Sequence, residues 1–350
     1  MTPASLLEQA KYYTKDGLQR FGYVTRKDLS CIEFQGALAT SRAYFPDRSY
    51  VGAVYDGRGA LVKSTQRYNQ GDLIPADPAI VDDLSSIGAD RCEQDIALYG
   101  GILFPILGHF LFESLSRLWP LLWLNEAERW PTPIYFHHWP GLDVAQLEAN
   151  PLYVQVLNAL GTDFGTIRVI DRPIGFTRLI VPDTASAYHL HLDIRMNDVF
   201  DRVVRSILGG PSHAGAYANG PKVFLSRSRW NENRRIQNES GLDEMLDGRG
   251  FRVVHTELLP PRELIAMLAT AGTVIATDGS HAHLAAFCKP GTPIIMLDTR
   301  PVPTQFAISA LRPLRALHLP LYETEVFDPG GRITDFNLLD QFIDLALDAL

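Results

Sequence analysis

Short apolar runs alternate with helical patterns throughout the second half of the chain. Each apolar run is four or five residues long, which is typical of buried parallel strands. The runs are 223–226, 251–255, 273–277 and 293–297. The segments between them that carry helix signals are 240–250, 261–271 and 281–288. This alternation of strands with helices of about ten residues predicts a doubly wound parallel α/β sheet.

The first half of the chain alternates less regularly. Its apolar runs are 49–55, 134–136, 167–171 and 179–181, and its helical patterns are 105–126 and 152–160. These segments favour a second α/β domain. A helical pattern over 193–208, followed by a stretch rich in Gly, Pro, Ala and Ser over 209–220, suits a boundary between domains. The last segment, 336–350, has the amphipathic pattern of a helix packed on the body.

Length and composition agree with two globular domains. The chain has 350 residues, of which 46% are hydrophobic and 21% are charged, and domains commonly span about 100–200 residues. We therefore expect an N-terminal α/β domain over residues 1–190, a C-terminal domain built on the parallel sheet over 191–330, and a terminal helix over 331–350.

Charge and cysteine content argue against several classes of protein. The formal net charge is −8, from 32 basic and 40 acidic residues, which disfavours bulk binding of nucleic acid. The three cysteines form neither a disulfide nor a metal-ligand pattern, so we expect a cytoplasmic location and no metal. The first 19 residues lack the apolar core of a signal peptide.

The longest apolar stretch, 100–124, is interrupted by His109, Glu113 and Arg117. A membrane-spanning helix rarely carries three ionisable groups. We therefore expect a soluble protein without a transmembrane segment, while peripheral association with a membrane stays open.

An arginine-rich loop follows the first strand of the predicted parallel sheet. It holds four arginines within nine residues, namely Arg227, Arg229, Arg234 and Arg235. Ligands of parallel sheets bind beyond the carboxyl ends of the strands, and the planar guanidinium group binds phosphate oxygens in pairs. This placement favours an anion site. The alternative is a solvated loop whose arginines pair with Glu232 or Glu239.

A second loop, 277–284, places glycine and small residues between a predicted strand and a helix start. Backbone N–H groups and the helix dipole favour an anion at such a position. His281 and His283 do not share a helical face and have no nearby cysteine, so a zinc site is not expected.

A helix in the first half carries His109, Glu113 and Arg117 at intervals of four residues, which places them on one stripe. Charges on one stripe commonly form ordinary surface ion pairs. The functional alternative is a stripe that faces a cleft, where a histidine or glutamate acts as general base.

Taken in order, these segments resemble glycosyltransferase family 61. The family pattern has a histidine followed four residues later by an acidic residue, which here are His109 and Glu113, and a strand that ends in Ser226-Arg227. Three later segments also match it: Arg-Arg-Ile-Gln-Asn-Glu at 234–239, Gly-Phe-Arg-Val-Val at 250–254 and Phe-Cys-Lys-Pro-Gly at 287–291. The similarity extends from about 99 to 297 and is densest from 222 onward.

The resemblance implies a GT-B architecture with two facing Rossmann-like domains, and an inverting, metal-independent transferase. Family 61 includes bacterial polysaccharide enzymes, plant xylosyl- and arabinosyltransferases, and animal O-linked N-acetylglucosaminyltransferases. The implied co-substrate is a nucleotide sugar, with UDP the favoured carrier and no other cofactor. The implied acceptor is a glycan or glycoconjugate, and the implied process is polysaccharide biosynthesis.

The resemblance also implies roles for individual residues. His109 is the expected general base, with Glu113 as the alternative base or as the partner that orients His109. The expected donor-binding residues are Arg227, Arg229, Arg234, Arg235, Asn238, Glu239, Asp278, Gly279, Ser280 and His281. Among them, Arg227 and Arg235 are expected on the diphosphate, whereas Asn238 and Glu239 would buttress the arginines or touch the nucleoside.

One loop departs from the family pattern. Where the family commonly has His-Gly-Ala-Gly-Leu, this chain has Asp-Gly-Ser-His-Ala at 278–282, so Asp278 replaces a histidine and His281 replaces a glycine. A side chain at 281 narrows the space beside the expected phosphates. Two alternative functions therefore stay open, a non-catalytic glycan-binding or scaffold protein and a nucleotide-sugar epimerase.

Overall fold

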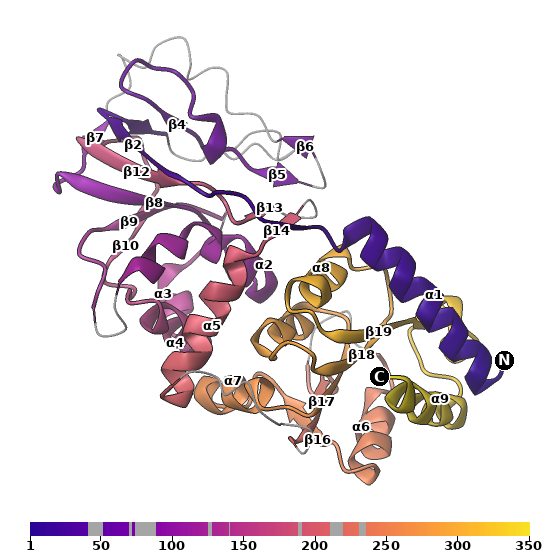
Figure 1. The fold of residues 1–350 in the computed structure, drawn as a ribbon. Coiled ribbons are helices and arrows are strands. Elements are labelled where there is room, and N and C mark those ends of the chain that lie inside the picture. The colour runs from indigo at the N-terminus through magenta and orange to yellow at the C-terminus, as the bar shows by residue number, and fades with distance from the viewer. Residues whose placement is uncertain are drawn as a thin grey trace. The chain divides into compact units, whose positions relative to one another are not determined.

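A computed structural model describes residues 1–40, 52–69, 72–73, 89–124, 128–139, 141–187, 191–210, 220–230 and 236–350. The chain forms two compact units and is a mixed α/β protein (Figure 1). Unit 1 comprises Met1–Val24 and Val204–Leu350, and unit 2 comprises Thr25–Val203.

Unit 1 is built on a five-stranded parallel sheet in the order β16-β15-β17-β18-β19. Its strands are β15 (Lys222–Ser226), β16 (Arg252–His255), β17 (Thr273–Thr277), β18 (Pro293–Asp298) and β19 (Arg315–Pro320). Its helices are α1 (Pro3–Phe21), α6 (Glu239–Gly248), α7 (Pro261–Ala269), η5 (Ser280–Phe287), α8 (Pro303–Leu311), η6 (Leu321–Glu323) and α9 (Phe336–Ala349). The parallel sheet predicted for the second half of the chain is confirmed.

The expected helix at 281–288 is a 3-10 helix, η5, which begins at Ser280. Gly279 precedes it with a φ of 139°, a value that L side chains rarely adopt. The amphipathic helix expected at 336–350 is α9, whose Leu339, Phe342 and Ile343 are buried in the core of unit 1.

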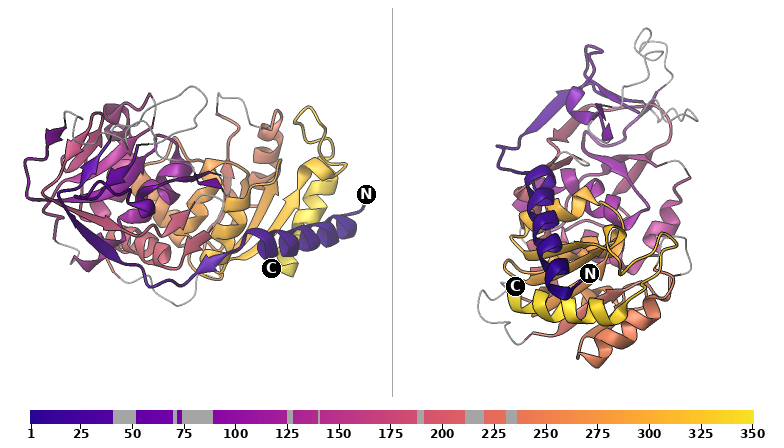
Figure 2. Two further views of the ribbon diagram at one scale, coloured as in Figure 1. Left: turned by 90° about the horizontal axis from the view of Figure 1, so that it is seen from above. Right: turned by 90° about the vertical axis from the view of Figure 1, so that its right-hand side faces the viewer.

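Helix α1 belongs to unit 1 although it lies at the start of the chain. It packs along β19, α8 and α9 (Figure 2). Its buried positions are Leu6, Ala10, Thr14 and Gly17. Only one of these four residues, Leu6, has a large apolar side chain. The sequence therefore shows no strong hydrophobic pattern for the buried face of α1.

Unit 2 contains a five-stranded sheet in the order β10-β9-β8-β12-β2, in which only the β2–β12 pair is antiparallel. Its strands are β2 (Cys31–Gln35), β8 (Ile96–Leu103), β9 (Ile134–His138), β10 (Ile167–Ile170) and β12 (Arg178–Pro182). A smaller sheet comprises β3 (Leu38–Ala39), β4 (Val54–Tyr55), β7 (Asp90–Arg91) and β11 (Ile174–Gly175). Residues of both sheets, including Val54, Tyr99 and Leu179, share one buried core.

The other elements are short, apart from α5. They are β1 (Val24–Thr25), η1 (Lys63–Thr65), β5 (Tyr68–Asn69), β6 (Asp72–Leu73), α3 (Val144–Glu148), α4 (Pro151–Ala159), β13 (Ser186–Ala187), β14 (His191–Asp193) and α5 (Arg195–Leu208). The strand expected at 49–55 is represented by β4, and residues 49–51 lie outside the described part of the chain.

The single helix expected over 105–126 is broken into three pieces. They are α2 (Leu107–Phe112) and the 3-10 helices η3 (Ser114–Arg117) and η4 (Trp119–Trp123). The Ser114 hydroxyl donates to the carbonyl of Ile102 and accepts from the N–H of Phe104, while the Ser116 hydroxyl donates to the carbonyl of Glu113. Serine side chains that bond to the main chain compete with helical geometry.

The expected domain limits differ from the observed units at both ends of unit 2. The expected N-terminal domain began at residue 1, whereas the first 24 residues pack in unit 1. The boundary between the domains was expected after residue 190, whereas the observed boundary between the units follows Val203, inside α5. In the described part of the chain, no helix combines the length and the apolar character that crossing a bilayer requires.

Candidate active site

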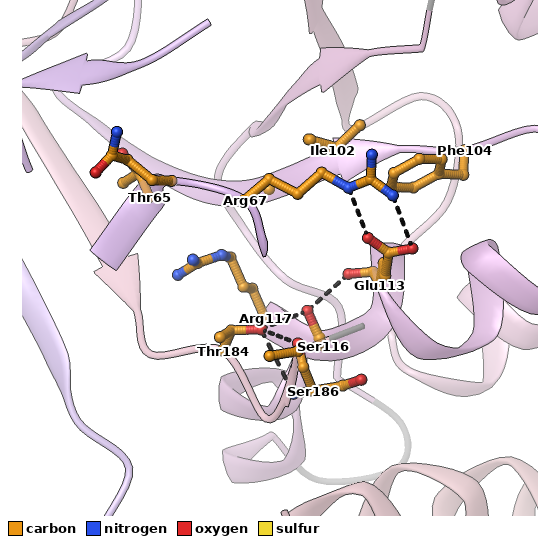
Figure 3. Close-up of a pocket in the computed structure, with 12 residues that line it drawn as sticks. Thr65, Arg67, Ile102, Phe104, Glu113, Ser116, Arg117, Thr184 and Ser186 are labelled. Atoms are coloured by element: carbon orange, nitrogen blue, oxygen red, sulfur yellow. Dashed lines mark hydrogen bonds and ion pairs between the residues drawn. The ribbon is translucent and has the colours of Figure 1, made fainter. Parts of the chain in front are cut away.

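A pocket in unit 2 is lined by residues of η1 and the chain after it, of β8, of η3 and of the chain around β13 (Figure 3). Its empty volume is about 430 Å³, part of which is open to solvent. The lining residues are Thr65, Gln66, Arg67, Gly101, Ile102, Phe104, Glu113, Ser116, Arg117, Thr184, Ser186 and Ala187. Most of these side chains are polar, which suits a ligand rich in hydroxyl groups.

Glu113 is held by two cationic or ionisable partners at the edge of this pocket. Its carboxylate accepts from Nε of Arg67 at 2.9 Å and from Nη2 of Arg67 at 3.4 Å. The same carboxylate contacts Nδ1 of His109, four residues earlier. The side chains of Arg67 and Glu113 are each 10% exposed and that of His109 is 21% exposed.

Aromatic rings enclose this cluster. The guanidinium carbon of Arg67 lies 4.9 Å from the ring centre of Phe104 and 5.5 Å from that of Trp139. The imidazole of His109 stacks on Phe104, with ring centres 5.0 Å apart and planes inclined by 24°. Contact with the face of an aromatic ring favours the Arg67 guanidinium, and stacking on Phe104 restricts the orientation of the His109 ring.

Arg67, Phe104 and Trp139 were not among the residues expected from the sequence. Arg67 is separated from Glu113 by 46 positions and reaches it only through the fold. Phe104 and Trp139 are ordinary apolar residues in the sequence, and nothing in their neighbourhoods signals an active site.

Arg117 does not continue the stripe of His109 and Glu113. Its side chain is buried and donates to the carbonyls of Pro182 and Ser64. Burial lowers the pKa of Arg117. The residue thus ties together three segments of the pocket wall. The expectation that it shares one helical stripe with His109 and Glu113 is wrong, because the helix breaks before Arg117.

The second group of expected residues lies in unit 1, at the carboxyl ends of neighbouring strands. Arg227 directly follows β15, and Asp278 and Gly279 follow the adjacent strand β17. Nη1 of Arg227 donates to the carbonyl of Asp278 at 3.5 Å. A Cβ atom added to Gly279 would lie 2.9 Å from this Nη1, so a substitution there would displace the end of the Arg227 side chain, and the φ of 139° would strain any L side chain.

Glu239 lies behind this arginine and is almost completely buried. Its Oε1 accepts from the N–H of Arg227 at 2.7 Å and from the hydroxyl of Thr277 at 3.4 Å. Burial raises the pKa of Glu239 to about 7, and the neighbouring Asp243 adds to this effect. Among the described residues, Oε2 of Glu239 has no hydrogen-bond partner.

His281 completes this buried group. Its Nε2 lies 3.3 Å from the hydroxyl of Thr277. Burial, together with the charge of Arg227, lowers the pKa of His281 to about 3, so the imidazole is neutral at physiological pH. A Cβ atom on Gly279 would lie 3.0 Å from Nδ1 of His281, which places the ring beside the loop.

Other expected donor-site residues are placed differently. The amide of Asn238 exchanges two hydrogen bonds with the main chain of Ile333, at 2.8 and 2.9 Å, so it fixes a loop of unit 1. Arg229 is exposed. Arg234 and Arg235 lie outside the described residues.

Asp278 bonds to two residues that follow the adjacent strand β18. Its Oδ1 accepts from the N–H of Thr299 at 3.0 Å and from the Thr299 hydroxyl, and its Oδ2 accepts from Nε of Arg300 at 3.3 Å. Ser280 begins η5 next to Gly279.

Within the described ranges, no three His, Cys, Asp or Glu side chains are grouped so that they could hold a metal ion.

Comparison with known proteins assigns the chain to a family. The sequence model described as Glycosyltransferase 61 matches residues 107–295, which is more than half of the chain and includes His109, Glu113, Arg227 and Gly279. No curated protein matches the sequence.

Two solved structures show weak similarity. One is the dodecameric iron-containing heptosyltransferase TibC in complex with ADP-D-beta-D-heptose, with 12% identity, a TM-score of 0.23, and coverage of 81% of this chain and 83% of that one. The other is the same glycosyltransferase from enterotoxigenic E. coli H10407, with 12% identity, a TM-score of 0.23, and coverage of 79% of each chain. Scores this low carry no argument, so the assignment rests on the family match: the chain belongs to glycosyltransferase family 61 and is a glycosyltransferase.

Proposed function

We propose that this protein is an inverting, metal-independent glycosyltransferase of GT-B architecture that transfers a sugar from a nucleotide sugar to a glycan or glycoconjugate. Each unit holds a sheet whose strands are largely parallel, which agrees with two Rossmann-like domains. In this proposal unit 1 binds the donor and unit 2 supplies the general base.

The approach of Arg227 to Gly279 is the observation that carries the donor site. Inverting transfer releases a nucleoside diphosphate, whose negative charge grows in the transition state and must be stabilised. A guanidinium group beside the N–H groups at the start of η5 supplies that stabilisation from the protein itself. Arg234 and Arg235 are proposed as further partners from the sequence alone.

His109 is the proposed general base. With Nδ1 protonated and donating to Glu113, the ring presents the lone pair of Nε2 to the acceptor hydroxyl. Glu113 is then the residue that orients His109 and stabilises the imidazolium, because Arg67 already engages both of its oxygens. The polar pocket beside Glu113 is proposed as part of the acceptor site.

A transfer assay tests the proposal. The protein would be incubated with UDP-, GDP- and CMP-sugars and a set of glycan acceptors, with and without EDTA. We expect transfer from one donor class, an inverted anomeric configuration by NMR, and no loss of rate with EDTA. Retention of configuration or loss of rate on chelation would refute the mechanism. Isomerisation of the donor in the absence of acceptor would instead identify an epimerase.

A further inference from the structure

A second arginine is anchored at the sheet edge where Arg227 lies. Arg300 follows β18, and its Nε donates to Oδ2 of Asp278. The Asp278 side chain is 7% exposed whereas that of Arg300 is 53% exposed. The anchoring carboxylate is therefore buried and fixed by Thr299, while the guanidinium it holds reaches solvent.

Both guanidinium groups contact the same residue. Arg227 donates to the main-chain carbonyl of Asp278, and Arg300 donates to its carboxylate. The strands that precede these three residues, β15, β17 and β18, are consecutive neighbours in the sheet. The carbonyl of Gly279 accepts from Nε2 of Gln305 at 3.2 Å, so main-chain acceptors of the loop are covered by protein donors.

Among the described residues, the Arg300 side chain is bonded only through Nε. A guanidinium held through Nε keeps its two Nη groups in a fixed plane, which matches the paired oxygens of a phosphate.

We propose that Arg300 is a second phosphate-binding residue of the donor site, and that Asp278 is the residue that positions it. The ligand class is a nucleoside diphosphate, bound between Arg227 and Arg300. This inference rests on the proposed donor function of unit 1. It gives the replacement of the family's histidine by Asp278 a role, since an aspartate at this position can orient an arginine that follows the next strand.

The competing explanation is an ion pair that only stabilises the surface. An ion pair with one half-exposed partner contributes little to stability. In this explanation Arg300 contacts no ligand, so its substitution leaves ligand binding unchanged. The two explanations therefore differ in one measurable property, the preference for a diphosphate.

Calorimetric titration of the full chain tests the proposal. UDP and GDP would each be titrated together with the matching monophosphate and nucleoside. For Arg300→Ala we expect the affinity for the diphosphate that binds the wild type to fall about 10-fold, the effect of one charged hydrogen bond on an exposed site. Affinity for the nucleoside should not change, and Arg300→Lys should restore part of the loss.

Two further variants separate positioning from general electrostatics. Arg315→Ala is the matched control, because Arg315 is also exposed but lies at the amino end of β19. Asp278→Asn removes a negative charge, which by itself would strengthen anion binding. We expect it to weaken diphosphate binding instead, and to cause no further loss when Arg300 is already alanine.

The outcomes distinguish this inference from the proposed function. If the wild type binds no nucleotide, the donor site of unit 1 is itself refuted. If the wild type binds a diphosphate, and Arg227→Ala weakens it while Arg300→Ala behaves like Arg315→Ala, only the role of Arg300 is overturned. A variant that unfolds would be replaced by Arg300→Gln, with the same outcomes applied.

Discussion

Two histidine–carboxylate pairs, one in each unit, have similar connections and very different surroundings. In unit 2, Nδ1 of His109 contacts Glu113 beside an open pocket. In unit 1, Nδ1 of His318 lies 3.0 Å from Asp298, and its Nε2 lies 3.3 Å from the hydroxyl of Ser309. The unit 1 group has the order serine, histidine and aspartate of a nucleophilic triad.

Access separates the two pairs. The side chains of His318 and Asp298 are both completely buried. Phe306 stacks on the imidazole of His318 with ring centres 4.1 Å apart, and the hydroxyl of Thr14 accepts from its main-chain N–H. No substrate can reach Ser309, so this triad-like group stabilises the fold. The comparison shows that connectivity alone does not identify an active site. The pocket beside Glu113 is the reason why His109, and not His318, is the proposed base.

The strongest test of the comparison removes the exposed histidine. His109→Ala is expected to lower the turnover number about 10²- to 10⁴-fold, because it removes the proposed general base. Nucleoside diphosphate affinity should stay near that of the wild type, since the proposed donor residues lie in unit 1. Steady-state kinetics and calorimetry measure the two quantities, and unchanged turnover would remove His109 from the role.

The same substitution in the buried pair should act on stability. His318→Ala leaves the carboxylate of Asp298 without its partner in an apolar interior, which we expect to cost about 3–5 kcal/mol in the free energy of unfolding. Denaturant unfolding measures this loss, with His109→Ala as the control that unfolds near the wild-type midpoint. Equal midpoints for the two variants would contradict the assignment of a structural role to His318.

A third ionisable group is the buried pair of Glu239 and His281, which share the hydroxyl of Thr277 as a partner. Here the expected effect is a dependence of stability on pH. The raised pKa of about 7 means that folded Glu239 keeps a proton that the unfolded chain has released. Stability should therefore fall as the pH rises from about 4.5 to about 7, by about 3 kcal/mol in total, and should not change further above that range.

Glu239→Gln is the matched variant for this pH dependence, because glutamine preserves the acceptor but carries no charge. Between pH 4.5 and about pH 7, the unfolding free energy of Glu239→Gln should fall less steeply with pH than that of the wild type, because one titrating group is absent. Identical slopes for the wild type and Glu239→Gln would show that this carboxyl group titrates normally.

A smaller effect is expected from Arg67, which acts on His109 only through Glu113. Arg67→Met keeps the apolar contact with Phe104 and removes the charge, so turnover should fall about 10- to 100-fold, as for other residues that orient a catalytic group. The pH at which the rate is half-maximal should also shift, whereas a purely structural residue would change the melting temperature alone. An unaltered pH profile would exclude this role.

The sequence was sufficient to predict the part of unit 1 that depends on local patterns. Buried parallel strands are continuous apolar runs, so β15, β16, β17 and β18 lie within one or two residues of their expected limits. Arg227 and Gly279 follow neighbouring strands, and the expectation that they lie close together at the carboxyl ends of these strands is confirmed.

The remaining features depend on contacts between distant parts of the chain. Arg67 becomes a partner of Glu113 only when two segments 46 residues apart meet in unit 2, and no local sequence pattern indicates that contact. The helix breaks after Phe112, where the hydroxyl of Ser114 bonds to the main chain of Ile102 and Phe104. The loop around Arg234 stays a prediction, because those residues lie outside the described part of the chain.

The position of α1 has a consequence for the order of events during synthesis. Thr14 bonds to His318, which is 304 residues further along the chain. A ribosome that adds about 5–20 residues per second needs roughly 15–60 s to cover that interval. All of unit 2 emerges in the meantime and is able to fold first, while α1 waits for β19 before its small-residue face can be buried.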